Sequence, residues 1–231
     1  MSKEPHSRSG ISHYVLELSV IVVGVTLSFA LNGWWQDRLG QESLMRDLKT
    51  IQINMESDRS ELLALIKDRE RCVTAMYQLT NYTMGAEAPK NAPQLMLDMS
   101  RAGFSFFPDT GAWKAMVASG NLRWINDNAL KNKLSRYYGH AVPRILDNNR
   151  LLDALVVRGL LSWVGGESPT KSPDDAGFVH FNLSNLEKEP LRRHIGKVVG
   201  HTTWYNELLG ITLQQLDEAM AAVTAKLAAS A

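Results

Sequence analysis

The chain has only one cysteine, Cys72, among its 231 residues. A single thiol excludes an internal disulfide and any metal site built from several cysteines. Because Cys72 lies on an apolar helical stripe, we expect a small buried hydrophobic side chain rather than a nucleophile. The chain also lacks an excess of positive or negative charge, since its formal net charge is +1. This balance provides no general electrostatic attraction for nucleic acid, so we predict no nucleic-acid partner.

Recognisable catalytic and cofactor motifs are missing as well. The six histidines form no HExxH or Glu-x-x-His pattern. His194 and His201 are seven residues apart, and a solvated flank of a helix explains them better than a metal site does. No glycine-rich phosphate loop and no Gly-x-Ser-x-Gly elbow occurs. We therefore predict no catalytic residue, no metal and no cofactor, and a protein that is not an enzyme.

One long apolar run is present near the start of the sequence. Residues 14–35 contain a single charged residue, Glu17. As a helix, they would extend about 33 Å at 1.5 Å per residue, enough to cross a hydrocarbon core of about 30 Å. We predict a retained single-pass transmembrane helix over residues 13–35, after an N-terminal tail of residues 1–12. Aromatic rings that favour the membrane–water boundary stand at its ends: Tyr14, Trp34 and Trp35.

A cleavable signal peptide is the main alternative to this anchor. Lys3 and Arg8 give a basic start, and the small residues of Ser-Phe-Ala, residues 28–30, have the spacing of a cleavage site. Against cleavage, Glu17 interrupts the early apolar run, and the hydrophobic segment continues to Trp35. A buried core helix is the third alternative, and the apolar character on all sides of the run disfavours it.

The polar and small residues of the apolar run share one helical face. At about 100° per residue, Glu17, Gly24, Ser28 and Asn32 fall on a narrow stripe. Gly24 and Ser28 form a small-xxx-small pair that allows two helix backbones to approach closely. We predict a membrane helix interface here, with a second copy of the chain or with a membrane protein partner. Alternatively, Glu17 and Asn32 reach the two headgroup layers and Gly24 has no role.

Two heptad patterns predict an all-α fold after the anchor. We expect one long helix over about residues 41–82, with Gly40 as the weak point between it and the anchor. Its apolar positions are Leu44, Leu48, Ile51, Met55, Leu62, Ile66, Val73 and Tyr77. The last helix has about 40 residues, and its stripe runs through Leu191, Ile195, Val198, Thr202, Tyr205, Leu209, Thr212, Leu216, Met220, Val223 and Leu227. An antiparallel helical bundle over residues 36–231, with a flexible loop at about 165–183, follows from these patterns.

Shorter helices are expected between the two long ones. Asp109 or Thr110 is a suitable N-cap for one of them, and Asn126 or Asp127 for the next. Pro143 then kinks or restarts the chain.

An aromatic-rich loop is the most distinctive feature of the part after the anchor. It contains Phe104, Phe106 and Phe107, and Trp113 follows shortly. Aromatic side chains concentrate at interaction hot spots, so these four residues are candidates for a partner or ligand contact. The alternative is structural: they close a gap at the end of the bundle.

Two motifs resemble an uncharacterised bacterial family of single-pass membrane proteins. The first is E-x6-G-x7-N-x-W, formed by Glu17, Gly24, Asn32 and Trp34. The second, SGNL…YY, comprises Ser119, Gly120, Asn121, Leu122, Ile125, Leu130, Leu134, Tyr137 and Tyr138. This sequence departs from the family pattern at Gly33, Trp35 and Gln36. The resemblance implies membrane topology and a helical domain, and it implies nothing about chemistry.

These observations lead us to expect a membrane-anchored helical interaction, scaffold or accessory subunit without catalytic activity. Its partners would be the lipid bilayer and a second copy or another membrane protein. A ligand-sensing helical domain that acts through a partner is the second hypothesis. Basic residues on the two sides of the apolar run nearly balance, but a short basic tail normally stays in the cytoplasm. We therefore place the chain in a bacterial inner membrane, with the bundle on the periplasmic side.

Overall fold

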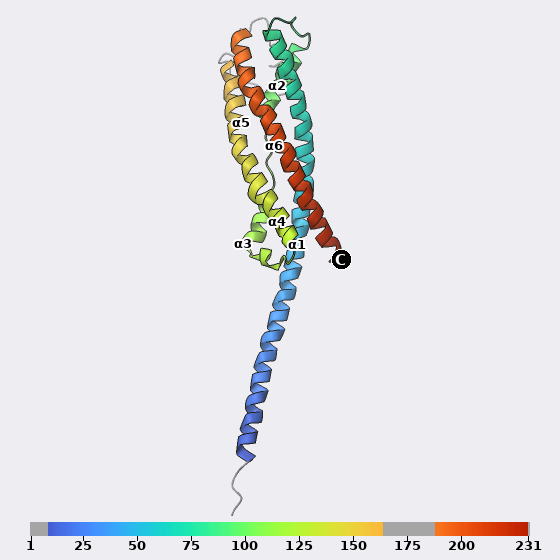
Figure 1. Cartoon of the computed structure of the whole chain (residues 1–231), viewed down its shortest axis with the longest axis vertical. Helices are drawn as coiled ribbons and strands as arrows, with labels where there is room; N and C mark the ends of the chain where they lie inside the picture. Colours follow the sequence, from blue (N-terminus) through green and yellow to red (C-terminus); the bar gives the residue numbers. More distant parts are fainter. Residues whose placement is uncertain (1–8, 164–187, 231) are drawn as a thin grey trace, which may run out of the picture.

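The computed structural model describes residues 9–163 and 188–230. The predicted loop at about 165–183 lies outside the described residues, and so do residues 1–8 of the predicted tail. The elements are α1 (Ser9–Thr83), α2 (Ala92–Ser100), η1 (Arg101–Gly103), α3 (Gly111–Ala118), η2 (Asn121–Trp124), α4 (Asn128–Arg136), η3 (Tyr137–Ala141), α5 (Val142–Trp163) and α6 (Lys188–Ala228). Within these ranges every regular element is helical, which confirms the predicted all-α fold (Figure 1).

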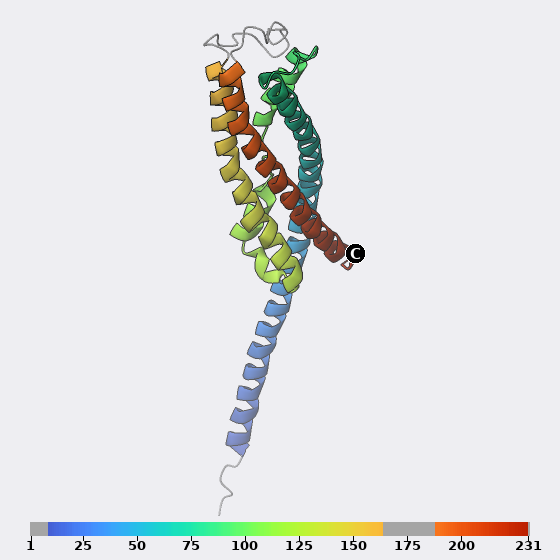
Figure 2. The same cartoon turned by 45° about the horizontal axis from the view of Figure 1, so that its top comes forward.

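The two long helices, α1 and α6, pack side by side in opposite directions (Figures 1 and 2). Three contacts between them show this direction. Gln52 Nε2 donates to Thr224 Oγ1 at 3.3 Å, Arg59 Nε pairs with Asp217 at 2.7 Å, and Arg69 Nε donates to Asn206 at 2.6 Å. Residue numbers therefore rise along α1 as they fall along α6. The prediction of an antiparallel bundle with two long helices is confirmed.

Helix α1 has two parts with different surroundings. Residues 14–39 are exposed at every position, and this part projects alone from the bundle (Figure 1). From Leu44 onward, one stripe of the helix is buried against the other elements. The sequence suggested a weak point at Gly40, but α1 continues through it as one helix of 75 residues. At 1.5 Å per residue this helix is roughly 110 Å long.

The buried stripe of α1 advances in strictly alternating steps of four and three residues, the spacing of a heptad seam. The predicted seam is correct as far as Leu62 and wrong afterwards: Ile66 and Val73 are only partly buried, and Tyr77 is exposed. The predicted register moves to Ile66 instead of Leu65, and Arg69 hides the true register because a search for apolar residues passes over it. Asp58 was passed over in the same way, but this did not shift the register. The observed seam is Leu44, Leu48, Ile51, Met55, Asp58, Leu62, Leu65, Arg69, Cys72, Met76 and Leu79. The expected burial of Cys72 is confirmed.

The predicted seam of α6 agrees closely with the structure. All its members from Leu191 to Leu216 are buried, as is Val223, while Met220 and Leu227 are partly buried and pack against the core. Thr202 and Thr212 occupy seam positions within this stripe and are fully buried. The pattern succeeded here because no charged residue interrupts it.

The connections between the middle helices follow local rules. Asp127 caps α4 as predicted, since its carboxylate accepts the N–H groups of Ala129 at 2.8 Å and Leu130 at 3.2 Å. Ahead of α3, Thr110 stands at the N-cap position without a side-chain capping bond, and Asp109 Oδ1 accepts the N–H of Gly111 at 2.8 Å instead.

Helices α4 and α5 are joined by a π-helical turn, η3, rather than by a sharp break at Pro143. The N–H of Val142 bonds to the carbonyl of Tyr137, five residues earlier. Proline has no N–H and cannot continue the ladder of four-residue hydrogen bonds. The chain therefore accommodates Pro143 by widening the preceding turn, which still buries Tyr137 and Tyr138.

Candidate functional site

The first part of the candidate site is the junction where the exposed part of α1 enters the bundle. Asn121, at the start of η2, donates through Nδ2 to Ser43 Oγ at 2.9 Å and to Asp47 Oδ2 at 2.8 Å. Gln41 Nε2 donates to the carbonyl of Trp124 at 3.1 Å. The SGNL segment is therefore fastened to α1 immediately after the apolar run.

Gly40 allows this close approach. A Cβ atom at Gly40 would lie 2.2 Å from Cε2 of Trp124, which is far inside van der Waals contact. The indole of Trp124 is covered in turn by the guanidinium of Arg123, whose Cζ lies 4.7 Å from a ring centroid. Gly120 makes the turn into η2 with a φ of +74°, a conformation that glycine adopts without strain.

Above the junction, a buried carboxylate connects three elements. Asp58 of α1 is 3% exposed and accepts the hydroxyl of Tyr137 at 2.9 Å and the N–H of Asp109 at 3.0 Å. Burial raises the pKa of Asp58, and these two donors offset only part of the rise. Tyr138 stacks on Trp113 with ring centroids 5.0 Å apart. The two tyrosines of the YY motif therefore link η3 to α1 and to α3, and Asp58 links α1 to the loop before α3.

A buried guanidinium forms the second polar centre. Arg69 is fully buried, and its acceptors are Asn206 Oδ1 at 2.6 Å and the carbonyls of Ala102 at 2.7 Å and Phe104 at 3.1 Å. Its Cζ also lies 4.5 Å from the ring centroid of Tyr205. Burial lowers the pKa of Arg69 to about 10, so it remains charged at neutral pH.

Next to Arg69, the side chains of Tyr205 and Asn149 hold the loop before α3 through the backbone of Phe106. Tyr205 accepts the N–H of Phe106 at 3.3 Å and donates its hydroxyl to Asn149 Oδ1 at 2.5 Å. Asn149 Nδ2 donates to the carbonyl of Phe106 at 2.7 Å. Both backbone groups of this buried residue are therefore satisfied by side chains from α5 and α6, as buried backbone requires.

The structure separates the four aromatic residues that the sequence grouped together. Phe106 is fully buried, and Trp113 is partly buried against Tyr138. Phe104 and Phe107 point outward and are 55% and 62% exposed. Of the four rings, those of Phe104 and Phe107 are therefore the most exposed.

The residues of the predicted membrane interface lie on the exposed part of α1. Glu17, Gly24, Ser28 and Asn32 are all exposed, and a Cβ atom at Gly24 would meet no other atom within 4 Å. Ser28 Oγ donates to the carbonyl of Gly24 at 2.8 Å, so its hydroxyl is satisfied within the helix. The three aromatic residues at the ends of the run are exposed as well: Tyr14, Trp34 and Trp35.

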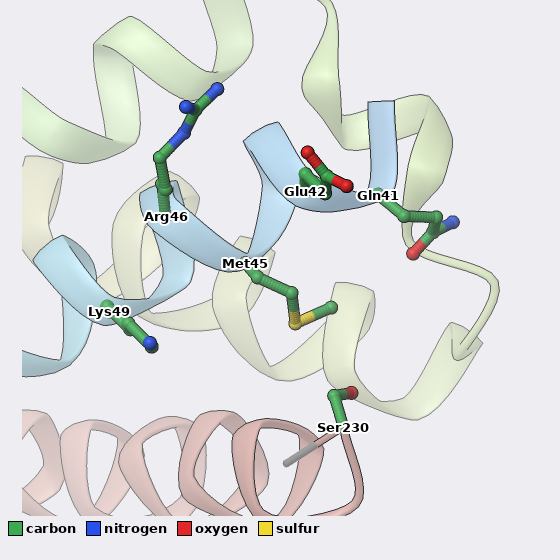
Figure 3. Close-up of a pocket in the computed structure, with 6 residues that line it drawn as sticks. All are labelled: Gln41, Glu42, Met45, Arg46, Lys49 and Ser230. Atoms are coloured by element: carbon green, nitrogen blue, oxygen red, sulfur yellow. The ribbon is translucent and has the colours of Figure 1, made fainter. Parts of the chain in front are cut away.

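An open depression of about 450 Å³ lies beside the junction, between α1 and the C-terminal end of α6. Figure 3 shows the side chain of Met45 extending toward Ser230 and that of Lys49 toward α6, while Arg46 points to the opposite side of α1. Gln41 and Glu42 complete the lining. Over the described residues, no group of three or more His, Cys, Asp or Glu side chains is arranged to hold a metal ion.

Several of these residues were missed from the sequence. Asp58 and Arg69 carry a local signal, since the alternating steps of the α1 seam pass through both positions. Asn149 carries no such signal, because its partners are the backbone of a distant loop and a side chain of another helix. The position of Tyr205 on the α6 stripe was predicted, but its bonds to Phe106 and Asn149 were not.

Comparison with known proteins gives a family but no function. No curated protein and no solved structure matches the chain. The model of DUF6090, a family of unknown function, matches residues 17–160, which is more than half of the chain. The match begins in the exposed part of α1 and ends in α5. The chain is therefore a member of the DUF6090 family of unknown function.

Proposed function

We propose that this chain is a single-pass membrane protein whose helical bundle serves as a non-catalytic interaction module. The observation that carries the proposal is the continuity of α1, which runs from the apolar segment into the core of the bundle without a break. Among the described residues, α1 alone is long and apolar enough to cross a membrane, judged by length and composition. Its exposed apolar circumference favours lipid as the surrounding medium.

The junction supports a mechanical role for this continuity. Asn121 and Gln41 fasten η2 to α1 directly above the apolar segment, and Trp124 packs on Gly40. A rotation or shift of the membrane helix would therefore move the bundle with it. This is useful for a scaffold, because the orientation of the bundle is set by whatever the membrane helix binds.

The two faces of α1 are also compatible with pairing of two copies. Twenty residues separate Gly24 from Leu44, and at about 100° per residue their side chains project roughly 200° apart around the helix. Leu44 begins the seam that is buried in the bundle. The face with Gly24 and Ser28 is thus directed away from the bundle, so two membrane helices could pair there without a clash between bundles. We propose self-association through this face in a bacterial inner membrane, with the bundles in the periplasm.

Disulfide cross-linking tests this proposal with a matched control. Ser28→Cys lies on the proposed interface, and Thr26→Cys lies on the opposite side of α1. Both wild-type hydroxyls donate to the carbonyl four residues earlier at 2.8 Å, so the two substitutions remove the same local contact. Cys72 is buried, and the unmodified chain therefore serves as the blank.

We expect copper-catalysed oxidation of native membranes to give a dimer with Ser28→Cys and little with Thr26→Cys or the blank. Equal cross-linking of the two variants would contradict the proposed face. Recovery of the chain in the supernatant after ultracentrifugation, with an N-terminus near residue 31, would contradict the anchor itself and favour the signal peptide.

A further inference from the structure

Arg69 is a buried cation whose observed partners are all uncharged. They are an amide oxygen, two backbone carbonyls and the face of a tyrosine ring. Over residues 9–163 and 188–230, no carboxylate forms an ion pair with it. Buried charges in proteins are normally paired, because an isolated charge loses its hydration without compensation. The environment of Arg69 is therefore suited to an additional negative group.

Three polar atoms in this region are buried and make no hydrogen bond within the described part of the chain. They are Arg69 Nη2, Thr202 Oγ1 and His201 Nε2. Thr202 differs from two other threonines of α6, whose hydroxyls donate to a backbone carbonyl four residues earlier. Thr212, the other buried threonine of the α6 seam, donates to the carbonyl of Leu208 at 2.8 Å, and exposed Thr203 donates to that of Val199 at 3.0 Å. The hydroxyl of Thr202 is thus available in the interior.

These atoms belong to one neighbourhood. His201 and Thr202 lie one helical turn before Tyr205 and Asn206, the two α6 residues that contact Arg69. Side chains three or four residues apart on a helix are neighbours, with about 5–6 Å between Cβ atoms. The pKa of His201 is lowered first by burial and second by the charge of Arg69, which is consistent with a short distance between the two side chains.

We propose that Arg69, Thr202 and His201 bind a small monovalent anion of the size of chloride between α1 and α6. Arg69 Nη2 and the hydroxyl of Thr202 donate to the anion, and neutral His201 can donate through Nε2–H. The anion supplies the charge that the neutral acceptors of Arg69 do not provide. The site lies inside the bundle, and it is independent of the proposed membrane anchor and of self-association.

Thermal unfolding of the full chain in a non-ionic detergent tests this site. Sodium chloride replaces sodium gluconate at constant ionic strength, because gluconate is too large for the interior. We expect the unfolding midpoint to rise by a few degrees and to saturate with chloride. Broadening of the chloride NMR line by the protein provides a direct measure of binding. Arg69→Gln should abolish both effects, and Arg71→Gln, an exposed arginine on the same helix, should retain them.

A second pair of variants keeps the test decisive if Arg69→Gln does not fold. Thr202→Val removes the buried hydroxyl without a large change of shape, and we expect the half-saturating chloride concentration to rise roughly tenfold. Thr203→Val should leave it unchanged. Equal stabilisation by chloride and gluconate, or equal chloride affinity of the two threonine variants, would overturn the proposal and leave the neutral acceptors as the only partners of Arg69.

Discussion

The two parts of α1 belong to one unbroken helix, yet they differ in every other respect. Residues 14–39 are apolar or aromatic around most of the circumference, and all are exposed. Beyond Leu44, most buried residues lie on one stripe with heptad spacing, and most exposed residues are polar or charged. Helix formation is therefore common to both parts. The distribution of apolar residues around the axis is what distinguishes a segment suited to lipid from one suited to a protein core.

Charged residues are also used differently in the two parts. Glu17 lies on the exposed surface of the first part. In the second part, Asp58 and Arg69 occupy the core seam, and each is bonded to elements that are distant in sequence. The second part thus depends on polar partners from other elements, and the first part does not. Substitutions should accordingly have their largest effect on folding in the second part and their smallest in the first.

Replacement of Arg69 should have the largest effect. Arg69→Met leaves the carbonyls of Ala102 and Phe104 and the amide oxygen of Asn206 without their donor, so we expect the free energy of unfolding to fall by about 2–4 kcal/mol. Arg71→Met is the matched control, because Arg71 is exposed and pairs at the surface with Asp68. Its effect should stay within about 0.5 kcal/mol. Urea unfolding of the full chain in detergent, followed by circular dichroism, measures both; equal losses would contradict a special role for Arg69.

The junction between the two parts should be next in sensitivity. Gly40→Ala places a Cβ atom against Trp124, and the indole must move away from α1. We expect a loss of about 1–3 kcal/mol in the free energy of unfolding. Gly33→Ala, seven residues earlier on the same helix, meets no atom within 4 Å and should cause no loss. If Gly40→Ala is as stable as Gly33→Ala, then the contact with Trp124 does not hold the two parts together.

The same contrast explains how much the sequence could predict. Local patterns were sufficient for the α6 seam, for the Asp127 cap and for the α1 seam as far as Leu62. They failed beyond Leu62 because the energetic cost of a charge at a seam position depends on its partners. Tyr137 is 79 residues from Asp58, and Asn206 is 137 residues from Arg69. Such partners are determined by tertiary packing, so a pattern confined to one helix cannot reveal them.

The aromatic loop shows the same limit on a smaller scale. Phe104, Phe106 and Phe107 look equivalent in sequence, but only Phe106 has its N–H and carbonyl bonded to buried side chains of α5 and α6. These two hydrogen bonds hold Phe106 in the core, whereas Phe104 and Phe107 remain exposed. Composition thus identified the loop as unusual, while the division between core and surface residues required the structure.

The ionisation of Asp58 should have a smaller effect on the free energy of unfolding, and this effect depends on pH. Burial raises the pKa of Asp58 in the folded chain above its unfolded value of about 3.9. The folded state therefore binds this proton more tightly. The corresponding stability is fully present below about pH 4 and is lost as the pH rises through the folded pKa. Because Asp58→Asn does not titrate, we expect the stability of the wild-type chain relative to this variant to fall as the pH is raised from about 4 toward neutral. Urea unfolding across this range measures the difference, and a constant or rising difference would contradict the expected sign.

Substitution of Gly24 should have the smallest effect on folding and yet a clear effect on association. A Cβ atom at Gly24 would meet no atom of another element within 4 Å, and residues 14–39 are all exposed, so Gly24→Leu should leave the urea unfolding of the bundle unchanged. Two helices that approach closely at this position would be forced apart by the larger residue. We therefore expect Gly24→Leu to reduce cross-linking in detergent when it is combined with Ser28→Cys. Unchanged cross-linking would remove the interface with Gly24, whereas a loss of bundle stability would mean that the first part of α1 packs on the second. Since these outcomes are distinct, this variant tests directly whether the exposed part of α1 serves association alone.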